Sequence, residues 1–551
     1  MGIPGLWEEV ERVLTLQDTT LAAESAACVE AKGRPLRIAV DASVVIYKLR
    51  ESTRPAAKYG GMNHPSRTFM TTACNLMIQG VQPVYIFDGP GRPTCKRDKF
   101  RPIAKRTNLY VPPPAPNAHG TRDIEQEYEF THVEDLAKQV LDLMGVPRWD
   151  APGEAEAECV ALEKAGLVDG IYTSDGDALA FGGQCIYRAR KNDQEEEKND
   201  KEEKKKNDEE LQKIQAADLE TAGRPAKVLA LAALLAGGDY RHGLRNCGFL
   251  NALRIVEKSA ALEKLYHIGK STAKEEARKG MLNGWRISQR DTFVGAVRNI
   301  SRLIADTVPS DWPSAQLLGL CLRPMISDDA TLEQLRPTIW IPKQPNIVEL
   351  RAFTARMFGW QSRQRAKQFL HRLTPGLLAN KLMAAGCQGQ DATDLIVQAK
   401  AKQQRKDTAN RSPVVKVSFM ALEIAPIDYD GEPIVPGFEW DERDKKDPKV
   451  PYEEEYPEFL ATFGAPSSLP RNAAGRNSGN SKRPAESDTA SSSTKKAKAT
   501  RRKPSAESTN TQRNSPSTVG TTNNGFTISG FRMPTRLDIS FAGNEDVIDL
   551  T

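Results

Sequence analysis

The sequence predicts an α/β protein: a central, mostly parallel sheet with helices on both faces, then a helical region, a small β-rich module and a disordered tail. Three short apolar segments, LRIAVDAS (36–43), PVYIFDGP (83–90) and GIYTSDGD (170–177), have the composition of buried strands. Helical patterns follow each of them, and strands that alternate with helices form parallel sheets through right-handed crossovers. Helical patterns dominate from 225 to about 385, whereas the chain from 465 onward is polar and poor in aromatic residues.

The segments between these strands differ in composition. A basic stretch, GRPTCKRDKFRPIAKR (91–106), is followed by the proline-rich YVPPPAPNAHG (110–120), which predicts a loop or an extended spacer. THVEDLAKQVLDLMG (131–145) has a helical pattern and ends at a glycine, as helices commonly do. The charges of segment 190–213 are of both signs, so we expect a solvated insertion there.

A different pattern appears after the helical region. VVKVSFMALEIAPIDYDG (414–431) alternates as strands do, and EEEYPEFLATFG (453–464) has the pattern of a short helix. These segments predict a small, separate β-rich module. We expect its aromatic residues to form a core, as a small β domain requires: Phe419, Trp440, Tyr452 and Tyr456.

Composition narrows the class of protein. The 77 Lys and Arg residues nearly balance the 72 Asp and Glu residues, so the net charge of +5 does not by itself indicate nucleic acid. The eight cysteines form no CxxC pair, which favours reduced thiols over a disulfide or zinc framework. The longest apolar run, VLALAALLAGG (228–238), is about half of a bilayer span. The start, MGIPGLWEEV, predicts neither a signal peptide nor a myristoylation site.

Acidic residues recur where apolar elements end. They follow the three predicted strands, open the segment APGEAEAECVALEKAG (151–166), and close the apolar helix at GGDY: Asp41, Asp88, Glu154, Glu156, Glu158, Asp175, Asp177 and Asp239. Taken singly, each has a simpler explanation, as a strand cap, a turn former or an acid at a helix N-terminus. Since the carboxyl ends of parallel strands share one edge of a sheet, we expect the set to converge there.

Such a cluster of like charges predicts a metal site. Close carboxylates repel one another, and a divalent cation removes the conflict. Mg²⁺ prefers oxygen ligands, and two such ions about 4 Å apart are a standard device for cleaving a phosphodiester. The six histidines are dispersed and show no HExxH spacing, which disfavours zinc.

Six motifs in order, MGIPGLW, VDAS, FDGP, APGEAEAEC, SDGDALAFG and LLAGGDY, resemble the XPG/flap-endonuclease family of structure-specific 5′ nucleases over about residues 1–300. The resemblance implies the family's nuclease fold and a Mg²⁺-dependent endonuclease with two metal ions, Mn²⁺ being able to substitute. It assigns the metal-binding, catalytic set as Asp41, Asp88, Glu154, Glu156, Asp175, Asp177 and Asp239. Glu158 is left as a helix-surface acid near the site.

The resemblance also implies DNA-binding residues. Gly2 would lie near the active site and the DNA branch point. Basic residues after the second strand would position the scissile phosphate, with Lys96 and Arg97 among the catalytic candidates; a merely solvated basic loop is the alternative. The candidates are Lys96, Arg97, Lys99 and Arg101.

The resemblance further implies a helix-two-turn-helix around a K⁺ ion, in GLRNCGFLNALRIVE (243–257). Gly243 and Gly248 would supply its turn backbone, and the N-terminus of the second helix would offer a phosphate site. The turn is shorter than the family's glycine-rich turn. A buried helical hairpin without DNA contact is the alternative.

The resemblance and the composition together imply the organisation of the chain, and the chromodomain-like module is implied by the resolvase branch of the family. The parts of the chain are an N-terminal nuclease region (1–110), an internal nuclease region (130–240) with the charged insertion, a helical DNA-binding region (241–385), a chromodomain-like module (410–464) and a disordered tail (465–551). The short spacer between the second and third strands is similar to the Holliday-junction resolvase branch. Resolution of Holliday junctions and cutting of 5′ flaps in DNA repair and recombination is therefore expected.

Two alternatives stay open: a flap-type replication or repair nuclease, and a non-catalytic scaffold that binds DNA junctions or chromatin. In the tail, KRPAESDTASSSTKKAKATRRK (482–503) has the pattern of a bipartite nuclear-import signal, which predicts a nuclear protein; nonspecific attraction to DNA is the competing interpretation. The terminal EDVIDLT resembles a SUMO-interaction motif. The expected partners are branched DNA, a second copy on the junction and SUMO, with no membrane.

Overall fold

The structure is a computed structural model that describes the ranges 2–45, 65–93, 133–189, 210–240, 243–401, 412–434 and 447–469. The chain divides into two units, 1–479 and 480–551, and every described residue belongs to the first. The charged residues 190–209, the nuclear-import pattern and EDVIDLT lie outside the described residues.

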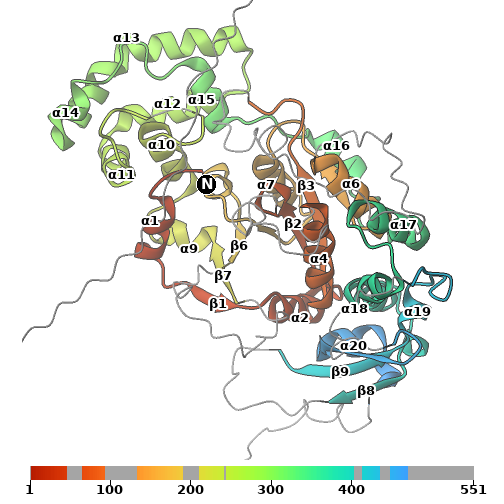
Figure 1. Ribbon diagram of the computed structural model, residues 1–551. Coiled ribbons are helices and arrows are strands. Elements are labelled where there is room, and N and C mark those ends of the chain that lie inside the picture. The colour runs from red at the N-terminus through yellow and green to blue at the C-terminus, as the bar shows by residue number, and fades with distance from the viewer. Residues whose placement is uncertain are drawn as a thin grey trace, which may run out of the picture. The chain divides into compact units, whose positions relative to one another are not determined.

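A seven-stranded sheet in the order β1-β7-β6-β5-β2-β3-β4 forms the centre of this unit (Figure 1). The three predicted strands are its adjacent members β5, β2 and β3, and the five strands from β6 to β4 are parallel. β7 and β1 add an antiparallel edge. The mostly parallel α/β fold is therefore confirmed. The strands are β1 (Gln17–Thr19), β2 (Leu36–Asp41), β3 (Val81–Phe87), β4 (Arg148–Asp150), β5 (Gly170–Tyr172), β6 (Cys185–Ala189) and β7 (Leu211–Gln215).

Alternation along the central strands builds one core on each face of the sheet. In β2, Ile38 and Val40 belong to one hydrophobic cluster, whereas Ala39 between them belongs to the other. Helix α7 contacts β2, β3 and β5 on the face of Ala39, and α2 and α4 cover the opposite face. Successive side chains of a strand point to opposite faces, so a strand with helices on both sides must be apolar throughout.

Helices connect and cover these strands. The expected helix of 131–145 is α6, and it stops at Gly145, whose φ of 71° lies in the left-handed region that suits glycine. The helices of the nuclease region are α1 (Leu6–Val13), α2 (Leu21–Lys32), α4 (Pro65–Ile78), α6 (Val133–Met144), α7 (Ala155–Lys164), α8 (Asp177–Phe181), α9 (Ala216–Thr221) and α10 (Ala226–Ala236).

The helical region begins with α11, as its pattern predicts. α10 and α11 pack as a hairpin, and α12, α13 and α15 extend the same core. Along the described ranges, no helix is both long and apolar enough to cross a membrane. The helices are α11 (Phe249–Lys258), α12 (Ala260–Lys270), α13 (Glu275–Ile300), α14 (Arg302–Ala305), α15 (Ala315–Leu322), α16 (Asp329–Leu335), α17 (Ile347–Met357) and α18 (Arg363–Cys387).

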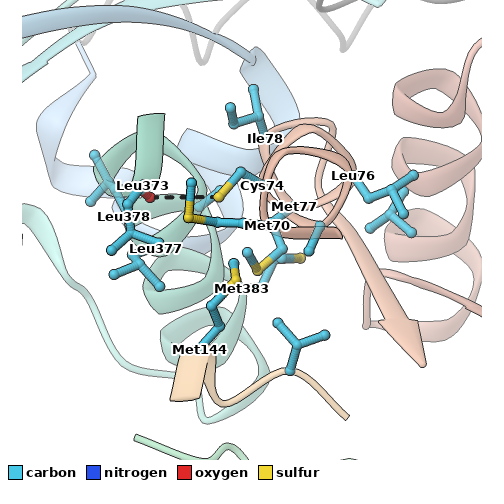
Figure 2. Packing of buried hydrophobic residues seen from close by; sticks show 14 of the residues in the cluster. Met70, Cys74, Leu76, Met77, Ile78, Met144, Leu373, Leu377, Leu378 and Met383 are labelled. Carbon is cyan, nitrogen blue, oxygen red and sulfur yellow. Dashed lines mark hydrogen bonds between the residues drawn. The ribbon is translucent and has the colours of Figure 1, made fainter. Parts of the chain in front are cut away.

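Helix α18 returns the chain to the sheet by packing against α4. Cys74 donates to the carbonyl of Leu373 at 3.9 Å where the two helices meet (Figure 2). A Cβ added to Gly376 would lie 2.7 Å from the Cα of Cys74, so only glycine allows this approach. Around the crossing, Met70 and Met77 of α4 and Leu377 of α18 belong to one hydrophobic cluster (Figure 2).

The predicted β-rich module is a three-stranded antiparallel sheet in the order β10-β9-β8, formed by β8 (Gln398–Ala401), β9 (Val414–Phe419) and β10 (Tyr452–Pro457). Two expected elements are wrong in part. Segment 414–431 leaves the strand for helix α19 (Ala421–Ile424), and 453–464 is a strand up to Pro457 before helix α20 (Glu458–Gly464). Pro457 caps α20, where its fixed φ suits the transition and its missing N–H is not needed.

This small sheet is not packed as a separate module. Its buried residues belong to the same hydrophobic cluster as α4 and α18, and Tyr456 donates to the carbonyl of Pro375 in α18 at 2.9 Å. Phe419, Tyr452 and Tyr456 are buried, so the prediction that they form core is confirmed. Trp440 lies outside the described residues.

Candidate metal centre

Three strand ends bring the first acids together. Asp41 is the last residue of β2, Asp88 follows β3, and Asp175 lies three residues past β5. Because these strands are parallel neighbours, their carboxyl ends share one edge of the sheet. A short network links two of the loops: Thr173 donates its hydroxyl to Asp41 Oδ2 at 3.1 Å and accepts from the backbone N–H of Asp175 at 3.0 Å.

Helix α7 brings two glutamates to the same edge. Its first backbone N–H, that of Ala155, donates to Asp88 Oδ1 at 2.9 Å, so the carboxylate after β3 fixes the start of this helix. Glu154 is the N-cap residue and Glu156 lies in the first turn, and both are buried. Acids are favourable at a helix N-terminus because the macrodipole is positive there.

Asp239 completes the centre from the loop after α10. One carboxylate oxygen from each of Asp175, Asp177 and Asp239 lies within 4.8 Å of the others, and all three residues are buried. The backbone N–H of Asp177 donates to Asp175 Oδ1 at 3.0 Å, which orients that carboxylate in the turn before α8. Converging carboxylate oxygens at this spacing suit a hard divalent cation such as Mg²⁺.

The electrostatics of Asp41 show how closely the acids crowd. Burial raises its pKa well above the usual value for aspartate, and the charges of Glu156, Asp88 and Asp175 raise it further. A hydrogen bond from the Ser43 side chain acts in the opposite direction and lowers the pKa. The backbone N–H of Ser43 also donates to Asp41 Oδ1 at 2.9 Å. Burial and the neighbouring acids therefore disfavour the ionised form of Asp41, and a bound cation would stabilise that form.

Gly2 lies directly against these carboxylates. A Cβ at this position would fall 2.1 Å from Asp175 Oδ1 and 2.6 Å from Asp177 Oδ1, and its φ of 77° is left-handed. Glycine is therefore required both by the backbone conformation and by the approach to the acids. Trp7 secures the segment by donating its indole N–H to the carbonyl of Ser174 at 3.0 Å.

Glu158 is not the helix-surface acid that the sequence suggested. Its side chain is fully buried and accepts from the indole of Trp149 at 2.9 Å, from the backbone N–H of Ser327 at 2.9 Å and from the Ser327 hydroxyl at 2.5 Å. Ser327 is 169 positions away in the chain, so no local pattern shows that Glu158 points inward. Glu158 fixes α7, the helix that presents Glu154 and Glu156.

Two further residues of the site were missed by the sequence reasoning. Tyr240 donates its hydroxyl to Glu154 Oε2, and burial, together with Glu154 and Asp177, raises the pKa of the tyrosine. Its place directly after Asp239, inside the motif GGDY, is the signal that could have found it. Arg92 lies 3.2 Å from Asp88 Oδ2, and its position four residues after that acid is the corresponding signal.

The helical hairpin is present in the expected place. Gly248 is the N-cap residue of α11, and a Cβ there would meet no atom within 4 Å. Gly243 packs so tightly that a Cβ would lie 2.1 Å from the carbonyl carbon of Ala236, and Asn246 is left-handed with φ of 62°. Residues 241–242 and the basic candidates Lys96, Arg97, Lys99 and Arg101 lie outside the described residues.

Fold and site together define the class of this protein: α/β, with a carboxylate-lined site for divalent cations at the carboxyl edge of a parallel sheet. Residues 1–108 match the XPG N-terminal domain, and residues 145–239 match the XPG I-region. In these two regions the chain is similar to the XPG/flap-endonuclease family.

Curated relatives match part of the chain. Flap endonuclease 1 of Glycine max is 29% identical over 253 residues, which cover 42% of this chain and 60% of that protein. Flap endonuclease 1 of Chlamydomonas reinhardtii is 30% identical over 245 residues, covering 41% of this chain and 58% of that protein. The matched region therefore spans less than two thirds of either relative.

Solved structures extend the likeness in fold beyond the nuclease region. The eukaryotic junction-resolving enzyme GEN-1 binding with cesium has a TM-score of 0.61 at 24% identity, covering 85% of this chain and 98% of that one. The Holliday junction-resolving enzyme GEN1 in complex with product DNA and Mg²⁺ has a TM-score of 0.58 at 23% identity, covering 84% and 97%. These neighbours share the fold with this chain.

Proposed function

We propose that this protein is a Mg²⁺-dependent, structure-specific endodeoxyribonuclease. The observation that carries the proposal is the convergence of Asp175, Asp177 and Asp239 within 4.8 Å, beside the buried Asp41 of the neighbouring strand. A protein that only bound DNA would gain nothing from buried carboxylates that repel both one another and the phosphates. This argues against the non-catalytic scaffold.

Each part of the site has a role in this proposal. Asp175, Asp177 and Asp239 would hold one cation, and Asp41, Asp88, Glu154 and Glu156 would hold or orient a second. Bound Mg²⁺ ions would supply an activated water and stabilise the leaving oxygen. Gly2 lets the backbone near the start of the chain approach Asp175 and Asp177, because a Cβ there would clash with both carboxylates. Glu158 and Ser327 keep α7 in place through their buried hydrogen bonds.

The proposed substrate is branched DNA, with cleavage near the branch point that leaves a 5′ phosphate. Holliday junctions are favoured because a GEN-1 neighbour shares the fold over 85% of the chain. Flap cutting is the second candidate, since the curated relatives are flap endonucleases. Shape and phosphate contacts, rather than base contacts, would select the substrate.

Further parts of the proposal concern regions around the site. Lys96, Arg97, Lys99 and Arg101 would position the scissile phosphate, with Gly243 and Gly248 framing a K⁺ site at the hairpin of α10 and α11. Solved structures that share this fold include GEN-1 binding with potassium and with sodium, which supports a monovalent ion there. The small sheet would act as a chromodomain-like module. Nuclear localisation, SUMO binding through EDVIDLT and a dimer on the junction belong to the same proposal.

The test uses purified full chain with end-labelled Holliday junction, 5′ flap and plain duplex, in Mg²⁺ or in EDTA. Paired symmetric nicks in the junction, absent in EDTA and in Asp175→Asn, are expected. Cleavage of the flap alone would instead support a flap-type nuclease. Tight binding of the junction without any cleavage would overturn the catalytic proposal. The matched control is Asp218→Asn, an exposed aspartate of α9.

A further inference from the structure

A tyrosine hydroxyl connects two separate segments of the metal centre. Tyr240 directly follows Asp239 in the loop after α10, whereas Glu154 directly precedes α7, and the two residues are 86 positions apart. The Tyr240 hydroxyl donates to Glu154 Oε2. This single contact therefore joins the loop that carries one proposed ligand to the helix start that carries two others.

We propose that Tyr240 is a positioning residue of the metal centre: its hydroxyl holds Glu154 in the orientation in which that carboxylate binds the cation. The inference rests on the proposed function, because it assigns Glu154 to the metal. Tyr240 itself need not touch metal or DNA. It acts through Glu154, and its effect is therefore on cation affinity.

The chemistry of the contact suits this role. A carboxylate among other carboxylates tends to turn away from them, and a neutral donor can hold it without adding or cancelling a charge. A lysine or arginine at the same place would form an ion pair with Glu154 and compete with the cation. The hydroxyl contacts Oε2, so the proposal assigns the other carboxylate oxygen, Oε1, to the cation. Such outer partners of ligands fix their geometry in metal sites generally.

Tyr240 also borders the space beside the proposed ligands. With Ile3, Asp177, Asp239 and Cys321, Tyr240 lines a cavity of about 30 Å³. That volume admits one or two water molecules, and two of the residues that line it, Asp177 and Asp239, are proposed ligands. The ring thus forms one side of the space next to the carboxylates, while its hydroxyl reaches Glu154.

The test compares Tyr240→Phe with Tyr187→Phe in the full chain. The control tyrosine is buried in β6 and donates to Glu24 Oε2 at 3.2 Å, so both variants lose one tyrosine-to-glutamate hydrogen bond. Binding of Mn²⁺ without DNA is measured by electron paramagnetic resonance, and thermal unfolding is measured in EDTA. We expect Tyr240→Phe to weaken Mn²⁺ binding about tenfold or more, and Tyr187→Phe to leave it unchanged. Both should unfold at similar temperatures.

A double-mutant cycle with Glu154→Gln shows whether Tyr240 acts through that residue. If it does, adding Tyr240→Phe to Glu154→Gln weakens Mn²⁺ binding much less than adding it to the wild type. Cleavage gives a second readout: a raised Mg²⁺ requirement, with the rate restored at saturating Mg²⁺. Unchanged Mn²⁺ affinity, or additive effects in the cycle, would overturn the positioning role. A wild-type chain that binds no Mn²⁺ would instead overturn the proposed function.

Discussion

The carboxylates at the two ends of the central strands have neighbours of opposite charge. At the amino end, Asp169 precedes β5 and accepts from Lys32 at 2.5 Å, from Arg34 at 2.7 Å and from the backbone N–H of Arg37 at 2.9 Å. At the carboxyl end, Asp41 closes β2 among other acids. The first carboxylate has its cations built into the chain, whereas the second is placed where a cation from solution would be bound.

The pKa values record this difference. Burial alone would raise the pKa of Asp169, but hydrogen bonds from Arg34 and Lys32 outweigh it and lower the pKa to about 2. Burial and neighbouring acids raise the pKa of Asp41 instead. The same residue type is therefore structural at one end of the sheet and a proposed metal ligand at the other, and its neighbours decide which.

The largest expected effect is a loss of cleavage without a loss of stability when an acid at the carboxyl end is neutralised. Asp175→Asn should reduce cleavage by about a thousandfold or more, because it removes a proposed ligand of the catalytic metal. Stability in EDTA should stay equal or rise, since the variant relieves repulsion among the acids. Single-turnover cleavage and urea unfolding measure the two quantities. Retained cleavage at saturating Mg²⁺ would contradict the assignment of this residue.

A smaller effect on activity is expected from the backbone at the same end. Gly2→Ala should lower cleavage about 10–100-fold, since its methyl group would displace the carboxylates of Asp175 and Asp177. Gly33→Ala is the matched control: Gly33 is also left-handed, with φ of 64°, but a Cβ there meets nothing within 4 Å. Equal losses in both variants would show that backbone strain, not blocking of the site, is responsible.

The amino end should show the reverse pattern. Asp169→Asn leaves Arg34 without its carboxylate partner and should cost about 2–3 kcal/mol in the free energy of unfolding. Cleavage per folded molecule should stay close to that of the wild type, because the acids at the opposite edge are untouched. Urea unfolding and cleavage at a temperature well below the transition test this. A large loss of activity with unchanged stability would contradict the assignment of Asp169 as a structural residue.

The sequence correctly predicts the features that depend only on short stretches of the chain. β2, β3 and β5 follow from apolar composition, and their terminal acids from position alone, because parallel strands bring their carboxyl ends to one edge. Short polar strands gave no such signal: β1 is only QDT, and it pairs with β7 across nearly 200 residues. Segment 453–464 has the pattern of a helix, yet its first half pairs with β9.

Long-range partners account for the rest of what was missed. The inward orientation of Glu158 depends on Ser327, and the contact of Tyr240 depends on Glu154, in both cases across a large separation in the chain. The small sheet shares a core with α4 and α18, and Tyr456 of its strand β10 reaches the carbonyl of Pro375 in α18. Residue type and spacing show which side chains can form such contacts, but only the packed fold selects the partners.

The smallest expected effect is a difference in pH dependence between the two ends. Asp169 binds a proton less tightly in the folded chain than in the unfolded chain, where its pKa is about 4. Its stabilising contribution is therefore complete above pH 4 and is lost as the pH falls toward 2. Asp41 does the opposite, because its raised pKa favours the protonated form in the folded chain. Without metal, its contribution is present at low pH and is lost as the pH rises above 4.

Unfolding in urea with EDTA, between pH 6 and pH 3, resolves the two contributions. The stability gap between wild type and Asp169→Asn should narrow by about 1 kcal/mol over this range, a value reduced by the screening that the half-exposed Lys32 admits. The free energy of unfolding of Asp41→Asn should increase relative to that of the wild type as the pH rises, because the amide cannot ionise. Saturating Mg²⁺ should remove that gain, because a bound cation stabilises the ionised Asp41 of the wild type. Parallel pH profiles for the two variants would mean that the carboxylates at the two ends do not differ in environment.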